Sequence, residues 1–186
     1  MDRMPRHFKS AVAACLLCLS PALALADDAR LDELFDQLAH AETEDAGRRI
    51  ESAISREMMR TGSPTLDLLM QRGADAIEAR DHAAAVEHLT ALIDHEPGLA
   101  QAWNLRAVGY YMTGAIGPAL HDLGQALILE PRHFRALQGL AVVLEELGQP
   151  EDALEILRAA LAIAPRDADI EGAVQRLETR FAGTPL

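Results

Sequence analysis

Prolines recur in this chain at an interval of 34 residues, at Pro97, Pro131 and Pro165. Gly114 and Gly148 are separated by the same interval. Small and apolar residues keep this register in three further series: Gly73, Ala107 and Ala141; Ala85, Ala119 and Ala153; Leu92, Ala126 and Ala160. A fixed period of this length is typical of proteins built from stacked repeats, so the chain is expected to fold as an array of similar units.

The residue types at these positions predict two helices in each unit. There is room for two helices of about 13 residues, and the small residues mark where their backbones approach closely. Gly114 and Gly148 suit a left-handed cap after the first helix, and the three prolines end the second. In the first unit Arg80 and Asp81 replace the glycine, and Asp81 is expected to cap the next helix. Pro150 suits a first helical turn, and an aromatic content of only 4% also favours helices over β-structure.

The unit formed by residues 100–133 resembles a tetratricopeptide repeat (TPR). It matches the signature of that family at Trp103, Ala107, Tyr110, Gly114, Ala119, Leu123, Ala126 and Pro131. Residues 134–167 match through Leu137, Leu140, Ala141, Leu144, Gly148, Ala153, Leu157, Ala160 and Pro165, and residues 66–99 match more loosely through Leu69, Gly73, Ala85, Leu89 and Pro97. The resemblance implies an all-α protein, an α-solenoid of stacked helix-turn-helix repeats. It specifies the fold and leaves the function open.

Helices are also expected on both sides of the three repeats. Residues 27–65 carry apolar stripes at helical spacing over 31–41 and 44–60, and we interpret them as an N-terminal helical pair, with a degenerate repeat as one hypothesis. Ser63 and Pro64 mark the start of the next helix. Residues 168–186 are expected to form a C-terminal capping helix and tail, with Ile170, Val174, Leu177 and Phe181 facing inward.

The first 26 residues are typical of a cleaved signal peptide. Arg3, Arg6 and Lys9 precede an apolar run, and the sequence Ala-Leu-Ala ends at Ala26 just before two acidic residues. Two alternatives are an uncleaved membrane anchor and a lipoprotein acylated at Cys15, where the preceding Val-Ala-Ala resembles a bacterial lipobox. The sequence therefore predicts export to the periplasm, with lipoprotein anchoring as the less favoured reading and no stable membrane insertion after cleavage.

Removal of this segment changes the chemistry that the mature chain can offer. Both cysteines, Cys15 and Cys18, would be lost, which leaves no disulfide, thiol nucleophile or thiolate metal ligand. The segment contains three basic residues and one acidic residue, so the formal net charge changes from −12 to −14. A surface of this charge makes nucleic acid an unfavourable partner.

The resemblance implies a concave surface, lined mainly by the first helix of each repeat, on which family members bind peptides or partner helices. The register places the following residues there: Asp67, Met70, Ala74, Ile77, Glu78, Gln101, Asn104, Val108, Tyr111, Met112, Arg135, Gln138, Val142, Glu145 and Glu146. We single out nine as the partner-binding groove: Met70, Ile77, Gln101, Asn104, Val108, Tyr111, Met112, Arg135 and Gln138. The alternative is that these residues are simply solvated, or are covered by the flanking helices. The lining has no lysine, which argues against the clamp that some family members use to hold a terminal carboxylate.

Sequence patterns of catalysis and cofactor binding give no candidates. His82, His88 and His95 are six and seven residues apart and so do not form a metal-binding pair on one helical turn. Trp103 and Tyr110 occupy family positions that usually pack between helices, which favours a core role. We therefore expect no catalytic residue, no cofactor site and no metal site, and a protein that is not an enzyme.

Two hypotheses for the function remain open. In the first, the protein is a periplasmic scaffold or adaptor that holds a partner peptide or helix, of unknown identity, in the concave groove. In the second, it is a structural subunit of a fixed cell-envelope complex and docks through its outer face or its N-terminal helices.

Export gives the first testable prediction. Because the charged start, the apolar run and the small-residue site agree, the mature protein should begin at Asp27 and be recovered with soluble periplasmic proteins. Intact-mass spectrometry of the purified protein checks this. A mass that retains Cys15 together with acyl chains would replace the soluble assignment with a lipoprotein.

Overall fold

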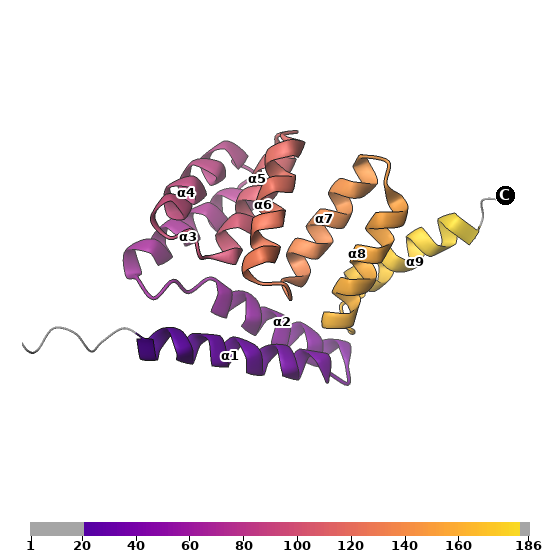
Figure 1. Ribbon diagram of the computed structural model, residues 1–186, viewed down its shortest axis with the longest axis horizontal. Helices are drawn as coiled ribbons and strands as arrows, with labels where there is room; N and C mark the ends of the chain where they lie inside the picture. Colours follow the sequence, from indigo (N-terminus) through magenta and orange to yellow (C-terminus); the bar gives the residue numbers. More distant parts are fainter. Residues whose placement is uncertain (1–20, 183–186) are drawn as a thin grey trace, which may run out of the picture.

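The computed structural model describes residues 21–182, with side chains from Ala29 onward, and within this range the secondary structure is entirely helical. Figure 1 shows the helices as a curved stack with a helical hairpin lying along one side. The helices are α1 (Pro21–Ala39), α2 (Glu44–Met58), α3 (Pro64–Glu78), α4 (His82–His95), α5 (Ala100–Met112), α6 (Ile116–Leu129), α7 (Phe134–Glu146), α8 (Pro150–Ile163) and α9 (Ala168–Ala182).

The turn between the two helices of a repeat has the left-handed backbone geometry that Gly114 and Gly148 predicted. Gly114 and Gly148 have φ angles of 78° and 75° and lie between the two helices of their repeats, and Arg80 adopts a φ of 60° at the equivalent position of the first repeat. Asp81 caps α4 as predicted, because its carboxylate accepts a hydrogen bond from the backbone N–H of Ala84 at 3.1 Å. Pro64 and Pro150 stand in the first turns of α3 and α8, where a missing N–H is tolerated.

Small side chains allow the two helices of each repeat to pack closely. Ala85, Ala119 and Ala153 are all fully buried. A Cβ atom built on Gly73 would lie 2.6 Å from two carbon atoms of Leu89, so α3 and α4 could not keep this spacing with a larger residue there. The pairs α3 and α4, α5 and α6, and α7 and α8 therefore form three similar units, as the period predicted.

A buried ion pair joins the two helices of the second repeat, and a hydrogen bond from the same arginine reaches the first repeat; neither contact was predicted from the sequence. The Arg106 guanidinium on α5 donates to both carboxylate oxygens of Asp122 on α6, at 2.6 and 3.0 Å, and to the hydroxyl of Thr90 on α4 at 3.1 Å. The guanidinium also lies 4.8 Å from the ring centroid of Trp103. Trp103 itself packs between two apolar clusters, as expected, and its indole N–H donates to the Pro97 carbonyl at 2.8 Å.

The hairpin formed by α1 and α2 does not simply extend the stack from its first repeat. Both helices run across the lower edge of the array in Figure 1, and α1 packs against α8 in the last repeat. Leu34, Phe35 and Leu38 of α1 and Ile54 of α2 are buried in one apolar cluster with residues of α7, α8 and α9. The sequence predicted this helical pair but not the surface on which it docks.

Two arginines of the repeats also contact the hairpin. Arg132 forms an ion pair with Asp32 of α1 at 2.8 Å, and its guanidinium lies 4.4 Å from the ring centroid of Phe35. Arg166 donates to the carbonyl of Ala41 at 3.3 Å. The hairpin therefore belongs to the same folded unit as the repeats.

The C-terminal helix caps the array as expected. The Asp167 carboxylate accepts hydrogen bonds from the backbone N–H groups of Asp169 and Ile170, both at 3.0 Å, and so caps α9. Ile170, Val174 and Leu177 are buried against the last repeat. Phe181, also predicted to face inward, is partly buried against the same cluster.

Most of the predicted signal peptide lies outside the described residues. Helix α1 begins at Pro21, so the predicted cleavage site after Ala26 falls within a helix of the uncleaved chain. Within residues 21–182, no helix is both long and apolar enough to cross a bilayer. Export and cleavage stay predictions.

The packing of the middle repeat gives the second testable prediction. Replacing the fully buried Ala119 by leucine should overpack the contact between α5 and α6 and lower the free energy of unfolding by about 1–3 kcal/mol. Leucine at the exposed helical position Ala83 is the matched control and should change it by no more than about 0.5 kcal/mol. Urea unfolding followed by circular dichroism measures both. Equal stability of the two variants would contradict the packing described here.

Candidate functional site

Helix α2 covers one half of the predicted concave face. Met59, directly after α2, packs against the cluster that contains Met70 of the first repeat. Further back along α2, Glu51 contacts Arg135 of the third repeat. In Figure 1 the helix runs along the lower edge of the array, and the space between it and the repeats is lined by residues at the starts of α5 and α7. Of the two alternatives left open by the sequence, cover by a flanking helix applies to this half of the groove.

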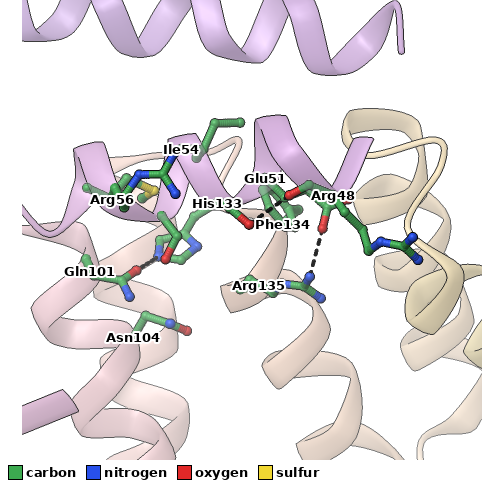
Figure 2. A pocket seen from close by; sticks show the side chains of 12 residues that line it. Arg48, Glu51, Ile54, Arg56, Gln101, Asn104, His133, Phe134 and Arg135 are labelled. Carbon is green, nitrogen blue, oxygen red and sulfur yellow. Dashed lines mark hydrogen bonds and ion pairs between the residues drawn. The ribbon is translucent and has the colours of Figure 1, made fainter. Parts of the chain in front are cut away.

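A polar pocket of about 540 Å³ remains between α2 and the repeats. Figure 2 shows how its walls are made by α2 on one side and by the starts of α5 and α7 on the other. The lining residues are Arg48, Glu51, Ser52, Ile54, Ser55, Arg56, Met58, Gln101, Asn104, His133, Phe134 and Arg135.

His133 fixes the arrangement of polar groups in this pocket. It is the N-cap of α7, and its Nδ1 accepts a hydrogen bond from the backbone N–H of Ala136 at 3.3 Å. The proton of the neutral ring must then be on Nε2, which donates to Oε1 of Gln101 at 3.0 Å. Burial lowers the pKa of His133 to about 4. The ring is therefore neutral at pH 7, with both nitrogens engaged.

This bond orients the amide of Gln101, and Asn104 adds a second amide one turn along α5. Because Oε1 of Gln101 accepts from His133, its NH₂ group is left to face the pocket. The side chain of Asn104 is only 6% exposed, lines the pocket and makes no hydrogen bond within the described residues. Two amides and the unpaired guanidinium of Arg56 thus offer hydrogen bonds to a group that enters the pocket.

An ionic centre closes the other end of the pocket. Arg135 of α7 contacts Glu51 of α2 at 3.0 Å and Asp167, the cap of α9, at 2.9 Å. Burial and the neighbouring Asp167 charge raise the pKa of Glu51. Oε1 of Glu51 is buried and has no hydrogen-bond partner within the described residues, while Oδ2 of Asp167 is buried against Arg135. One guanidinium therefore ties together three helices that are distant in sequence.

The nine predicted groove residues fall into three places. Gln101, Asn104 and Arg135 meet at the pocket. Ile77, Val108, Tyr111, Met112 and Gln138 lie farther along the first helices, beyond the pocket lining, and range from half-buried to exposed. Met70 is wrong as a groove residue: it is fully buried in the apolar cluster of the first repeat and exposes no surface to a partner. The residues that α2 contributes to the pocket were not predicted, since an amphipathic stripe does not show which surface it will contact.

The uncovered half of the concave face is defined here as the open strip. It is formed by the C-terminal halves of α3, α5 and α7 and consists of Ile77, Glu78, Val108, Met112, Val142 and Glu146. Met112 is 54% exposed and Val142 is 41% exposed. Tyr111 lies beside the strip, where burial and a hydrogen bond to Glu146 raise its pKa.

Comparison with known proteins identifies the family. A family model described as tetratricopeptide repeat matches residues 111–177. A TPR repeat-containing protein of Rhizobium etli is 35% identical over 154 residues, which cover 83% of this chain and 76% of the relative. The chain belongs to the tetratricopeptide-repeat family, and its fold is the α-solenoid that the resemblance implied.

Solved structures with the same fold include complexes with peptides. The first TPR of Spaghetti (RPAP3), bound to the HSP90 peptide SRMEEVD, aligns with a TM-score of 0.59 at 17% identity, covering 63% of this chain and 94% of that chain. The type III secretion chaperone SycD of Yersinia enterocolitica, in complex with a peptide of the translocator YopD, aligns with a TM-score of 0.58 at 13% identity, covering 64% and 96%. At these identities the likeness shows the fold alone.

The buried histidine gives the third testable prediction. The unfolded chain takes up a proton on His133 below its ordinary pKa of 6.5, whereas the folded protein resists protonation down to about pH 4. The stability that this histidine supports is therefore fully present above pH 6.5 and is lost as the pH falls towards 4. His133→Asn keeps a capping oxygen but does not titrate. Between pH 7 and pH 5 the wild type should lose about 2 kcal/mol of unfolding free energy more than this variant.

Urea unfolding at a series of pH values measures this difference. His95→Asn, at an exposed position near the end of α4, is the control and should leave the pH dependence of the wild type unchanged. If the free energy of unfolding changes with pH in the same way in the wild type and in the His133→Asn variant, His133 is not held neutral in the folded state.

Proposed function

We propose that this protein is a non-enzymatic scaffold or adaptor of the bacterial periplasm, which holds a peptide or helix of a partner protein against the concave face of its repeats. The observation that carries the proposal is the open strip, where Met112 and Val142 expose apolar side chains on α5 and α7, the two helices whose starts line the pocket. Large apolar side chains that gather on an exposed surface are typical of interaction sites.

The geometry of the pocket supports binding rather than catalysis. Both ring nitrogens of His133 are engaged, and its low pKa leaves it unable to exchange protons near neutral pH. The carboxylates of Glu51 and Asp167 are tied to Arg135. The remaining amides of Gln101 and Asn104 are suited to hydrogen bonding with a peptide backbone.

Solved structures of the same fold support the binding of a peptide, and the N-terminal sequence supports the periplasmic location. The repeats of Spaghetti and of SycD have the same fold and are seen with bound peptides. The periplasmic location rests on the signal-peptide pattern of residues 1–26. The partner is expected to be a protein, and no cofactor is needed for this role.

Removal of the apolar side chains from the open strip gives the fourth testable prediction. The double variant Met112→Ser, Val142→Ser should keep its helicity, because both side chains are exposed, and should weaken partner binding at least about tenfold, or about 1.4 kcal/mol. Affinity capture from envelope extract, with quantitative mass spectrometry of the retained proteins, measures the loss.

The matched control removes two exposed apolar side chains from the second helix of a repeat. Ile128 and Leu129 of α6 are 72% and 41% exposed, and their double serine variant should capture partners as well as the wild type does. If capture is lost in the α6 variant and kept in the strip variant, the concave face is not the working surface. The protein would then be better described as a fixed subunit that docks through its outer face.

A further inference from the structure

The open strip has an apolar centre. Val108 and Met112 are four residues apart on α5, and therefore on one face of that helix, while Val142 occupies the position equivalent to Val108 on α7. Ile77, at the end of α3, is partly buried beside α5. A partner that covers this centre must supply apolar side chains of its own, because the exposed Met112 and Val142 would otherwise lose water without gaining contacts.

The charged residues of the strip are acidic. Glu78 and Glu146 occupy equivalent positions at the ends of α3 and α7, and both are exposed. Neither forms an ion pair within the described residues, whereas the neighbouring Glu145 is neutralised by Arg176 of α9 at 2.6 Å. No member of the strip is basic, so its two carboxylates are left without a compensating charge.

The cations of the concave face lie at its other end. Arg48, Arg56 and Arg135 all line the pocket beneath α2 (Figure 2). Because α2 covers that end and leaves the strip open, an incoming partner meets the acidic part of the groove directly. The acidic net charge of the whole chain adds a long-range attraction for a cation.

We propose that the open strip binds a cationic amphipathic segment of a partner protein, one that places apolar side chains on Val108, Met112 and Val142 and lysine or arginine beside Glu78 and Glu146. This inference rests on the proposed function and names the chemistry of the partner. Two uncompensated carboxylates beside an apolar centre select such a segment over an acidic one, since like charges brought together across an interface are unfavourable. Because its charges are exposed, the contact should weaken with salt.

The experiment uses three synthetic peptides of the same length and leucine pattern, whose polar positions are all lysine, all glutamine or all glutamate. Fluorescence anisotropy measures the affinity of the protein for each peptide at ionic strengths of about 0.1 M and about 1 M. The lysine peptide should bind at least about tenfold more tightly than the glutamine peptide at the lower ionic strength, and this advantage should shrink at the higher one. The glutamate peptide should bind most weakly.

Two charge-matched variants separate the strip from the net charge of the protein. Glu78→Gln with Glu146→Gln should lose most of the advantage of the lysine peptide. Glu87→Gln with Glu155→Gln removes two exposed carboxylates from the second helices α4 and α8 and should keep that advantage within about twofold. Thermal melting confirms that both variants fold.

Three results would overturn the inference. Equal losses in the two variants would assign the attraction to the overall charge of the protein. Equal binding of the lysine and glutamine peptides would show that the strip recognises apolar side chains alone. Failure of all three peptides, with envelope partners still captured through Met112 and Val142, would leave the proposed function standing and remove the cationic partner.

Discussion

The docking of the α1 and α2 hairpin on the last repeat is the contact on which the rest of the structure depends. Leu34, Phe35, Leu38 and Ile54 are buried there with side chains of α7, α8 and α9. Burial of large apolar side chains in this way contributes about 1.5–3 kcal/mol each. The same contact fixes α2 across the concave face, so stability and the shape of the binding surface have one origin.

Polar contacts then set the position of α2 more finely. Arg135 lies between Glu51 and Asp167, and its loss would leave two buried carboxylates without their shared cation. His133 acts in a similar way on the repeats, because its role as a helix cap fixes its tautomer and hence the orientation of Gln101. The hydrogen-bond donors of Gln101 and Arg135 are therefore held in fixed orientations in the pocket between α2 and the repeats.

The groove that results has two unlike halves. Under α2 it is a half-open pocket lined by arginines and amides, while beyond α2 it is exposed, apolar and acidic. The sequence placed Gln101, Asn104 and Arg135 on the same concave face as Val108 and Met112, and the structure brings the first three together at the pocket. The sequence could not separate the two halves, because the division is made by a helix more than 40 residues away in the chain. Met70 was misplaced because packing within the first repeat buries it.

What the sequence determined by itself is the array of three repeats. Glycines that adopt positive φ, prolines that end helices and alanines that permit close packing act locally, so their 34-residue period can be read directly as structure. Only the tertiary structure decided where the hairpin lies, how Arg106 and Arg135 find their carboxylates, and which half of the groove stays open. These features depend on contacts between distant segments of the chain. An apolar stripe or a single charged residue indicates that a side chain will be in contact with another segment, but it does not indicate which segment.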